Sequence, residues 1–239
     1  MNLPSIPPKQ LRLCLLRRVV FVDWHGVLSR DLFWSSILGS DHHPLRTQLE
    51  GGLGKVFSGA STADAWMKGL VSSRQVVSNM GISLDGRFRE DYLVRRLNDD
   101  CVRMRVNVEL LEFLRSLRST AAVVLATDNM DCFATAFEQA RRRRRRSSLD
   151  TRTLAGWADF CDDIICSSDV GRLKAEDPPG FFGGWLAENG LWFDDALLID
   201  DKVDNCEAFR GAGGHSVQWR MGADTVEELT KAIGPWITP

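Results

Sequence analysis

Short apolar runs alternate with polar segments of helical period along this chain. The runs are rich in β-branched and aliphatic residues, as is typical of parallel strands that are buried on both faces. They are Val19–Asp23, Ala122–Thr127, Asp163–Ser167, Ala196–Asp200 and His215–Trp219. Segments with apolar residues at helical spacing lie between and after them: Val108–Leu117, Met130–Arg142, Gly180–Asn189, Lys202–Gly211 and Thr225–Ile233. This alternation predicts an α/β fold, a Rossmann-like parallel sheet core with helices on both faces. Gly190, Gly211 and Gly234 are predicted to end helices.

The first two predicted strands are far apart in the sequence. Asp23 and Ala122 are separated by about a hundred residues, whereas a crossover requires only about 10–12. We therefore expect a small, mostly helical cap domain inserted after the first strand, with the core at residues 1–29 and 107–239 and the cap at 30–106. The candidate cap helices are Arg30–Leu38, Ala63–Val71 with Trp66 and Leu70 on one face, and Tyr92–Arg105. The glycines predicted to separate the cap helices are Gly51, Gly52, Gly54, Gly59, Gly81 and Gly86.

Polar residues follow the predicted strands at their carboxyl ends, where open α/β sheets gather catalytic groups. They are Asp23-Trp24-His25, Thr127-Asp128-Asn129, Lys174 in the segment after the third strand, and Asp200-Asp201. This set suits phosphoryl transfer, which requires a nucleophile, a divalent metal and groups that neutralise the phosphoryl oxygens. Asp23 is the candidate nucleophile. Asp200 and Asp201 are candidate Mg²⁺ ligands because Mg²⁺ prefers carboxylate oxygens.

Thr127 and Lys174 complete this chemistry. The Thr127 hydroxyl is suited to hydrogen-bond a phosphoryl oxygen, and the Lys174 ammonium to neutralise charge and hold the nucleophile. Asp128 and Asn129 follow Thr127 directly, so we expect them to line the substrate site together with Trp24.

The segments DWHGVL, LATDN, VGRLKAEDP and LLIDDKVDNCEAFRGAG resemble, in order, the four motifs of the haloacid dehalogenase-like (HAD) hydrolases. The resemblance runs from about Val19 to Trp219 and implies that family's fold, with a cap between the first two motifs. It implies an aspartyl-phosphate intermediate on Asp23, phosphate binding by Thr127 and Lys174, and a Mg²⁺ site at the acidic pair. Of that pair, Asp201 is our first choice as the direct ligand.

The sequence departs from the pattern at His25, where phosphatases of the family usually carry a second Asp that protonates the leaving group. A histidine can act as general acid and base near neutral pH. The metal contact that the resemblance implies at this position is a backbone carbonyl, which His25 also provides. His25 could equally be a structural histidine beside the site.

This departure leaves several reactions open. We expect a Mg²⁺-dependent phosphatase acting on a small phosphorylated metabolite. The alternatives are a phosphotransferase, a phosphonate hydrolase or dehalogenase-type hydrolase, and a catalytically impaired protein that binds a phosphorylated ligand. Dehalogenases of the family lack the acidic metal pair, so Asp200 and Asp201 favour a phosphoryl substrate.

Composition and charge exclude other classes. Hydrophobic residues make up 44% and charged residues 26% of the 239 residues, as in ordinary globular proteins. The net charge of -2 argues against nucleic-acid binding, and we interpret the run Arg141–Arg146 as a solvated helix end. The cysteines form no CxxC pair, so we expect reduced, mostly buried thiols at Cys14, Cys101, Cys132, Cys161, Cys166 and Cys206.

No apolar stretch approaches the roughly 20 residues that span a bilayer. The basic pair Arg17-Arg18 follows the apolar part of the N-terminal segment, which is the wrong order for a signal peptide. We therefore expect a cytoplasmic protein with no membrane partner. The sequence does not indicate its oligomeric state.

Overall fold

A parallel sheet forms the centre of the computed structural model, which describes residues 17–143 and 152–237. Its strands lie in the order β3-β2-β1-β4-β5, and every pairing is parallel. Their bounds are β1 (Val19–Val22), β2 (Ala122–Thr127), β3 (Asp163–Cys166), β4 (Ala196–Asp200) and β5 (His215–Gln218). The five strands agree with the predicted runs to within one residue at each end. The predicted Rossmann-like α/β fold is therefore confirmed.

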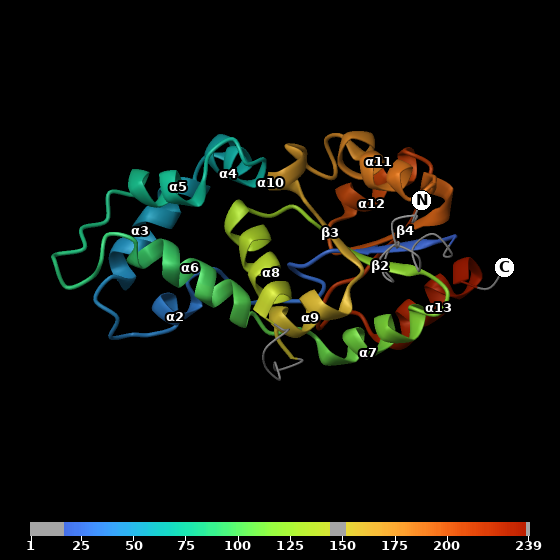
Figure 1. Cartoon of the computed structure of the whole chain (residues 1–239), viewed down its shortest axis with the longest axis horizontal. Helices are drawn as coiled ribbons and strands as arrows, with labels where there is room; N and C mark the ends of the chain where they lie inside the picture. The colour runs from blue at the N-terminus through green and yellow to red at the C-terminus, as the bar shows by residue number, and fades with distance from the viewer. Residues whose placement is uncertain (1–16, 144–151, 238–239) are drawn as a thin grey trace, which may run out of the picture.

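Helices cover both faces of the sheet, because successive side chains of a strand point to opposite faces. Val20 and Val22 belong to a core cluster with α7 (Val108–Leu117), α8 (Asp131–Arg143), α9 (Leu154–Phe160) and α13 (Val226–Ile237). Val19 and Phe21 pack on the other face against α11 (Pro178–Glu188) and α12 (Val203–Gly211). Figure 1 shows the sheet between these two layers. Burial on both faces explains why the strands are continuous apolar runs rather than alternating ones.

The long insertion between β1 and α7 is helical, and it lies to one side of the sheet (Figure 1). Its helices are α2 (Ser35–Leu38), α3 (Arg46–Phe57), α4 (Ala60–Met67), α5 (Ser73–Asn79) and α6 (Tyr92–Arg103). Helix α6 packs along α8 and α9, so the insertion rests on the core. The helical content agrees with the expectation for a cap, while the domain boundaries at 29/30 and 106/107 stay a prediction.

Two predicted cap helices are misplaced. The helix predicted over Arg30–Leu38 is wrong for its first part, because Trp34 takes a left-handed conformation with φ 53° and the helix begins only at Ser35. The Trp34 indole is fully buried and donates to Leu93 O at 2.8 Å, so tertiary packing fixes this break. Helix α4 starts and ends earlier than the predicted Ala63–Val71. Trp66 is buried but Leu70 is 72% exposed, so the two share no buried face.

Several predicted helix ends are also wrong. Gly51, Gly52 and Gly54 lie inside α3, where Gly52 lets the helix approach Met80: a Cβ there would lie 3.0 Å from the Met80 side chain. Gly234 lies inside α13, whose residues Leu229 and Ile233 are buried. In both helices packing outweighs the modest helix penalty of glycine, about 1 kcal/mol. The predicted helix end at Gly211 is confirmed, because Gly211 is the last residue of α12. Gly190, Gly81 and Gly86 do fall in turns, with positive φ.

The sequence interpretation missed α3, α5, α9, the short helix α10 (Ser167–Val170) and the 3₁₀ helix Phe193–Asp195. The cysteines within the described residues (Cys101, Cys132, Cys161, Cys166 and Cys206) are free and buried, as expected. Cys14 and Arg144–Arg146 of the arginine run lie outside the described residues. No helix of the described segments is long and apolar enough to cross a membrane.

Candidate active site

Asp23 lies at the point where the winding of the chain reverses. From β1 the chain passes to β2 and β3 on one side of the sheet, and β4 and β5 lie on the other side of β1. The Asp23 backbone N donates to Ile199 O at 2.9 Å, which sets Asp23 beside Asp200 at the end of β4. This is the position at which open α/β sheets bind ligands.

Lys174 lies fully buried between two carboxylates. Its Nζ is 2.5 Å from Asp200 Oδ2, 3.0 Å from Asp23 Oδ1 and 3.2 Å from Ala126 O. These three contacts use the three protons of the ammonium group. The Lys174 backbone N donates to Asp128 Oδ1 at 3.0 Å, so Asp128 holds the loop that carries the lysine. The structure thus brings Asp23, Lys174 and Asp200 together from distant parts of the sequence.

The two carboxylates of the acidic pair, Asp200 and Asp201, differ in their hydrogen bonds. Asp200 accepts from Lys174, from the Lys202 backbone N at 2.9 Å and from Asn205 Nδ2 at 3.0 Å. Asp201 Oδ1, by contrast, is buried and has no hydrogen-bond partner among the described residues. Oxygens of Asp23, Asp200 and Asp201 all lie within 4.8 Å of one another. Three converging carboxylates with an unsatisfied oxygen fit a divalent cation, which prefers oxygen ligands.

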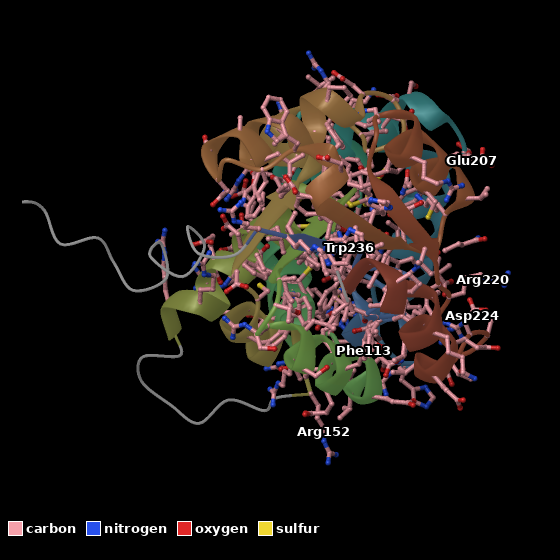
Figure 2. The ribbon with its side chains drawn as sticks, turned by 90° about the vertical axis from the view of Figure 1, so that its right-hand side faces the viewer. Phe113, Arg152, Glu207, Arg220, Asp224 and Trp236 are labelled. Atoms are coloured by element: carbon pink, nitrogen blue, oxygen red, sulfur yellow. The ribbon has the colours of Figure 1, made fainter. Side chains whose placement is uncertain are left out.

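Gly26 shapes this acidic group from the turn after β1. Its φ is 85°, and a Cβ at this position would lie 2.2 Å from Asp201 Oδ2. The loop after β5 holds this turn in place, because the Met221 backbone N donates to Gly26 O at 2.8 Å. That loop is closed by the Arg220–Asp224 ion pair, at 3.2 Å (Figure 2). The sequence interpretation missed this support, for which the only signal was the glycine after His25.

Burial and neighbouring charges shift the protonation equilibria of the group. Burial raises the pKa of Asp23 to about 7 against the opposing effect of Lys174, and Asp200 and Asp128 add to the rise. Burial and the Asp200 charge raise the pKa of Asp201. Burial lowers the pKa of Lys174, but Asp200, Asp23 and Asp128 outweigh it and raise the pKa, so the ammonium stays charged. The site as it stands carries uncompensated negative charge, which a bound cation would relieve.

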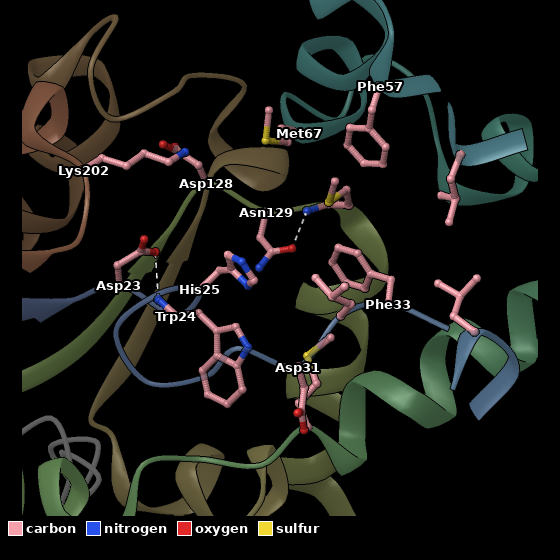
Figure 3. A pocket seen from close by; sticks show the side chains of 15 residues that line it. Asp23, Trp24, His25, Asp31, Phe33, Phe57, Met67, Asp128, Asn129 and Lys202 are labelled. Atoms are coloured by element: carbon pink, nitrogen blue, oxygen red, sulfur yellow. Dashed lines mark hydrogen bonds between the residues drawn. The ribbon is translucent and has the colours of Figure 1, made fainter. Parts of the chain in front are cut away.

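A cavity of about 440 Å³ opens beside Asp23. Its lining includes Trp24, His25, Asp128 and Asn129 from the predicted site. The cavity also contains Lys202, a cation that the sequence interpretation missed although it directly follows the acidic pair. Figure 3 shows the imidazole of His25 between Asp23 and the ring of Phe33, with Phe57 and Met67 beyond Asn129.

The predicted site residues differ in their exposure and in their hydrogen-bond partners. The side chain of His25 is exposed, whereas Trp24 is 1% exposed and packs against Phe133, and its buried Nε1 has no partner among the described residues. Thr127 is buried at the end of β2, and its Oγ1 accepts from Asn129 Nδ2 at 3.4 Å. All the predicted positions therefore lie at the carboxyl ends of β1, β2 and β4 or in the Lys174 loop. Their chemical roles stay predictions.

No protein-family model matches the sequence, and no curated protein matches it either. Solved structures do match. A HAD family enzyme from Bacteroides thetaiotaomicron, in complex with magnesium and inorganic phosphate, has a TM-score of 0.57 at 15% identity, covering 88% of this chain and 98% of its own. A HAD phosphatase from Thermococcus onnurineus has a TM-score of 0.58 at 17% identity, covering 91% and 98%.

An L-2-haloacid dehalogenase from Xanthobacter autotrophicus, with chloropropionic acid covalently bound, has a TM-score of 0.55 at 13% identity, covering 94% of this chain and 85% of its own. These structures extend over nearly the whole chain, including the helical insertion. At 13–17% identity these matches show the fold alone. The chain therefore has the fold of the haloacid dehalogenase-like hydrolases, as the order of its motifs predicts.

Proposed function

We propose that this protein is a Mg²⁺-dependent phosphohydrolase that acts on a small phosphorylated substrate through an aspartyl phosphate on Asp23. The observation that carries the proposal is the Asp23–Lys174–Asp200 arrangement with the unsatisfied Asp201 oxygen beside it. A structural ion pair would have no need of a third carboxylate. An in-line phosphoryl transfer needs both the nucleophile and a metal beside it.

Asp201 and Asp23 are the residues that would hold Mg²⁺, with Asp200 close by and the backbone carbonyl of His25 as a further ligand. Three carboxylates and one ammonium leave two net negative charges when all are ionised, which a divalent cation balances. When bound, the ion would supply positive charge to the phosphoryl oxygens. Asp200 is already saturated by Lys174, Lys202 and Asn205, which supports Asp201 as the direct ligand.

The chain's own residues account for the remaining chemistry. A carboxylate oxygen of Asp23 attacks phosphorus, the ester P–O bond breaks, and the leaving alkoxide takes a proton from His25. His25 then removes a proton from water, whose oxygen attacks phosphorus, and the bond between phosphorus and Asp23 breaks to release inorganic phosphate. Lys174 orients Asp23 and balances its charge. Its three ammonium protons are already engaged with Asp23, Asp200 and Ala126 O, so none is free to donate to the substrate.

The other residues of the site bind or position the substrate in this proposal. Thr127, buried behind Asn129, donates to a phosphoryl oxygen. Asn129 and Lys202 line the end of the cavity that carries Asp23. Asp128 acts chiefly through the Lys174 loop that it holds. The buried, unpaired Nε1 of Trp24 supports a hydrogen bond to a ligand.

The decisive experiment compares wild type with Asp23→Asn on a panel of phosphate monoesters, with and without Mg²⁺. We expect metal-dependent hydrolysis that falls by at least about 10³-fold in the variant, since nucleophile loss removes the covalent route. Asp99→Asn is the matched control, because Asp99 is an exposed residue of α6 away from the cavity. Equal activity of wild type and Asp23→Asn would overturn the proposal, and silence of both would favour the ligand-binding alternative.

His25 requires a separate test. His25→Ala and His25→Asp are compared with wild type over a range of pH. The proposal expects His25→Ala to lose most of its kcat, and His25→Asp to recover part of it with a pH profile displaced to lower pH, since a carboxyl group has the lower pKa. An unchanged profile in both variants would remove His25 from proton transfer and leave Asp23 unaffected as the nucleophile.

A further inference from the structure

The cavity beside Asp23 has two chemically different ends. The end formed at the sheet carries Asp23, His25, Asp128, Asn129 and Lys202. The other end is formed mainly by the insertion and is apolar, with Met130 of the core beside it. These apolar lining residues are Leu32, Phe33, Leu38, Leu53, Phe57, Met67, Met104 and Met130. A ligand that fills the cavity must therefore combine a charged group with an apolar one.

Two of the apolar side chains are left open to solvent. Leu32 is 61% exposed and Phe57 is 52% exposed, although large hydrophobic residues gain free energy from burial. Both line the same cavity, and Figure 3 shows Phe57 on the side of Phe33 and Met67, away from Asp23. Exposed apolar residues that converge on one hollow, next to a charged site, are a common feature of ligand pockets.

The insertion brings almost no charge into the cavity. Among the described lining residues, Asp31 is the single charged side chain that the insertion contributes. Its carboxylate is already engaged, because Oδ2 accepts from the Arg105 backbone N at 2.7 Å and Oδ1 from Arg105 Nη2 at 2.8 Å. The apolar end therefore offers few groups that could pair with the hydroxyls of a sugar or polyol, and an unpaired buried hydroxyl is costly.

We infer that the substrate is the phosphate monoester of an apolar alcohol, aliphatic or aromatic, whose organic group occupies the end of the cavity lined by Leu32, Phe33 and Phe57. This inference rests on the proposed phosphohydrolase function. The phosphoryl group lies at Asp23, between His25 and Lys202, and the organic group lies against the insertion. A volume of about 440 Å³ suits an organic group of moderate size, since ligand pockets span about 300–1,000 Å³.

The first arm of the test measures kcat/KM for hexyl phosphate and glycerol phosphate with Mg²⁺. Both leaving groups are aliphatic alcohols, so a preference reports on binding of the organic group. We expect hexyl phosphate to be favoured by at least about tenfold. Phe57→Asn should reduce that preference, whereas Leu70→Asn should leave it unchanged, because Leu70 is 72% exposed in the same insertion but lies outside the cavity. Equal kcat/KM for the two esters would overturn the inference and leave the phosphohydrolase proposal standing.

The second arm needs no turnover. Affinities of alkylphosphonates from methyl to hexyl are measured by calorimetry on the whole protein with Mg²⁺. Each methylene group that enters the apolar end should tighten binding by about fourfold, and Phe57→Asn should flatten the series while Leu70→Asn does not. If the affinity of wild type does not rise from methyl to hexylphosphonate, the inference that the organic group binds the apolar end is overturned. A rising series without hydrolysis of any ester overturns the proposed function instead, so the two failures are distinguishable.

Discussion

Gly26 occupies a turn with φ 85°, and a Cβ added at this position would collide with the side chain of Asp201. Residue-scale geometry of this kind decides whether the acidic group can assemble at all. Glycine is required here for two independent reasons, a backbone conformation that side chains rarely adopt and a distance of 2.2 Å between an added Cβ and Asp201 Oδ2. The sequence placed a glycine after His25, but its necessity depends on a residue far along the chain.

We expect Gly26→Ala to destabilise the protein by about 1–3 kcal/mol, the usual range for a side chain forced into the left-handed region. It should also weaken Mg²⁺ binding, because Asp201 must move. Urea unfolding and calorimetric Mg²⁺ titration measure the two effects. Gly51→Ala is the matched control: Gly51 is an exposed helical glycine with nothing within 4 Å of an added Cβ. The control should gain about 0.5–1 kcal/mol. Equal behaviour of the two variants would contradict this account.

Lys174 is the second residue on which the site depends. Lys174→Met leaves Asp23 and Asp200 buried without their shared cation, so we expect a loss of about 3–5 kcal/mol in unfolding free energy along with loss of activity. Lys231→Met is the control, since Lys231 forms an exposed ion pair with Glu227 within one helix and should matter little. Chemical denaturation of both variants at neutral pH is the measurement. A small effect at Lys174 would show that the carboxylates do not need it for stability.

At the scale of elements, two segments of the chain connect the insertion to the core, and they lie side by side. The Asn107 backbone N donates to Leu28 O at 2.8 Å, and Asp31 pairs with Arg105. The segment with Leu28 and Asp31 leads into the insertion, and the segment with Arg105 and Asn107 leads out of it into α7. The pair therefore fastens the entry of the insertion to its exit, at the rim of the cavity.

This contact makes a pH-dependent contribution. The hydrogen bond from the Arg105 side chain lowers the pKa of Asp31, so the stabilisation is present above the unfolded pKa of about 3.9 and is lost as the pH falls through the lower folded value. We expect Asp31→Asn to be slightly less stable than wild type at neutral pH and to converge with it in strong acid. The effect is small because the Arg105 side chain of the pair is 82% exposed. Urea denaturation at both pH values checks it, and a gap that persists in acid would assign the effect to packing.

Two helices of the insertion differ from what their local sequence predicts. Gly51, Gly52 and Gly54 predicted a break, yet α3 runs through them because Leu49 and Val56 are buried on the same helix and Gly52 fits against Met80. Trp34 predicted continuation, yet it breaks the helix because its indole reaches Leu93 O. In each case a partner distant in the sequence outweighs a local propensity worth about 1 kcal/mol or less.

For the whole molecule, the insertion is tied to the core around the site. Asp131 at the start of α8 accepts hydrogen bonds from Trp66 Nε1 at 3.1 Å and from the Ser73 backbone N at 3.0 Å. Lys68 forms an ion pair of 2.6 Å with Glu176, in the same loop as Lys174. The cavity, the Lys174 loop and the insertion are thus parts of one connected structure.

A metal that binds the folded state must stabilise the whole molecule, by about 2.7 kcal/mol when its concentration is a hundred times its Kd. We expect Mg²⁺ to raise the Tm of wild type and to have little effect on Asp201→Asn, which lacks the charged ligand oxygen. Asp99→Asn, exposed on α6, should respond as wild type does. Thermal unfolding with and without Mg²⁺ is the measurement. An equal shift in Asp201→Asn would place the ion elsewhere.

The pattern of residues along the chain was sufficient to predict the strands, most core helices and the polar groups at the strand ends, because a short apolar run and a 3.6-residue period are local properties. It could not indicate the order β3-β2-β1-β4-β5, which places Asp23 beside Asp200. Nor could it indicate that Lys174 pairs with Asp200 as well as with Asp23, that Asp201 keeps an unsatisfied oxygen, or that Leu32 and Phe57 face the same cavity. These features depend on contacts between residues distant in the sequence, and such contacts exist only once the chain has packed.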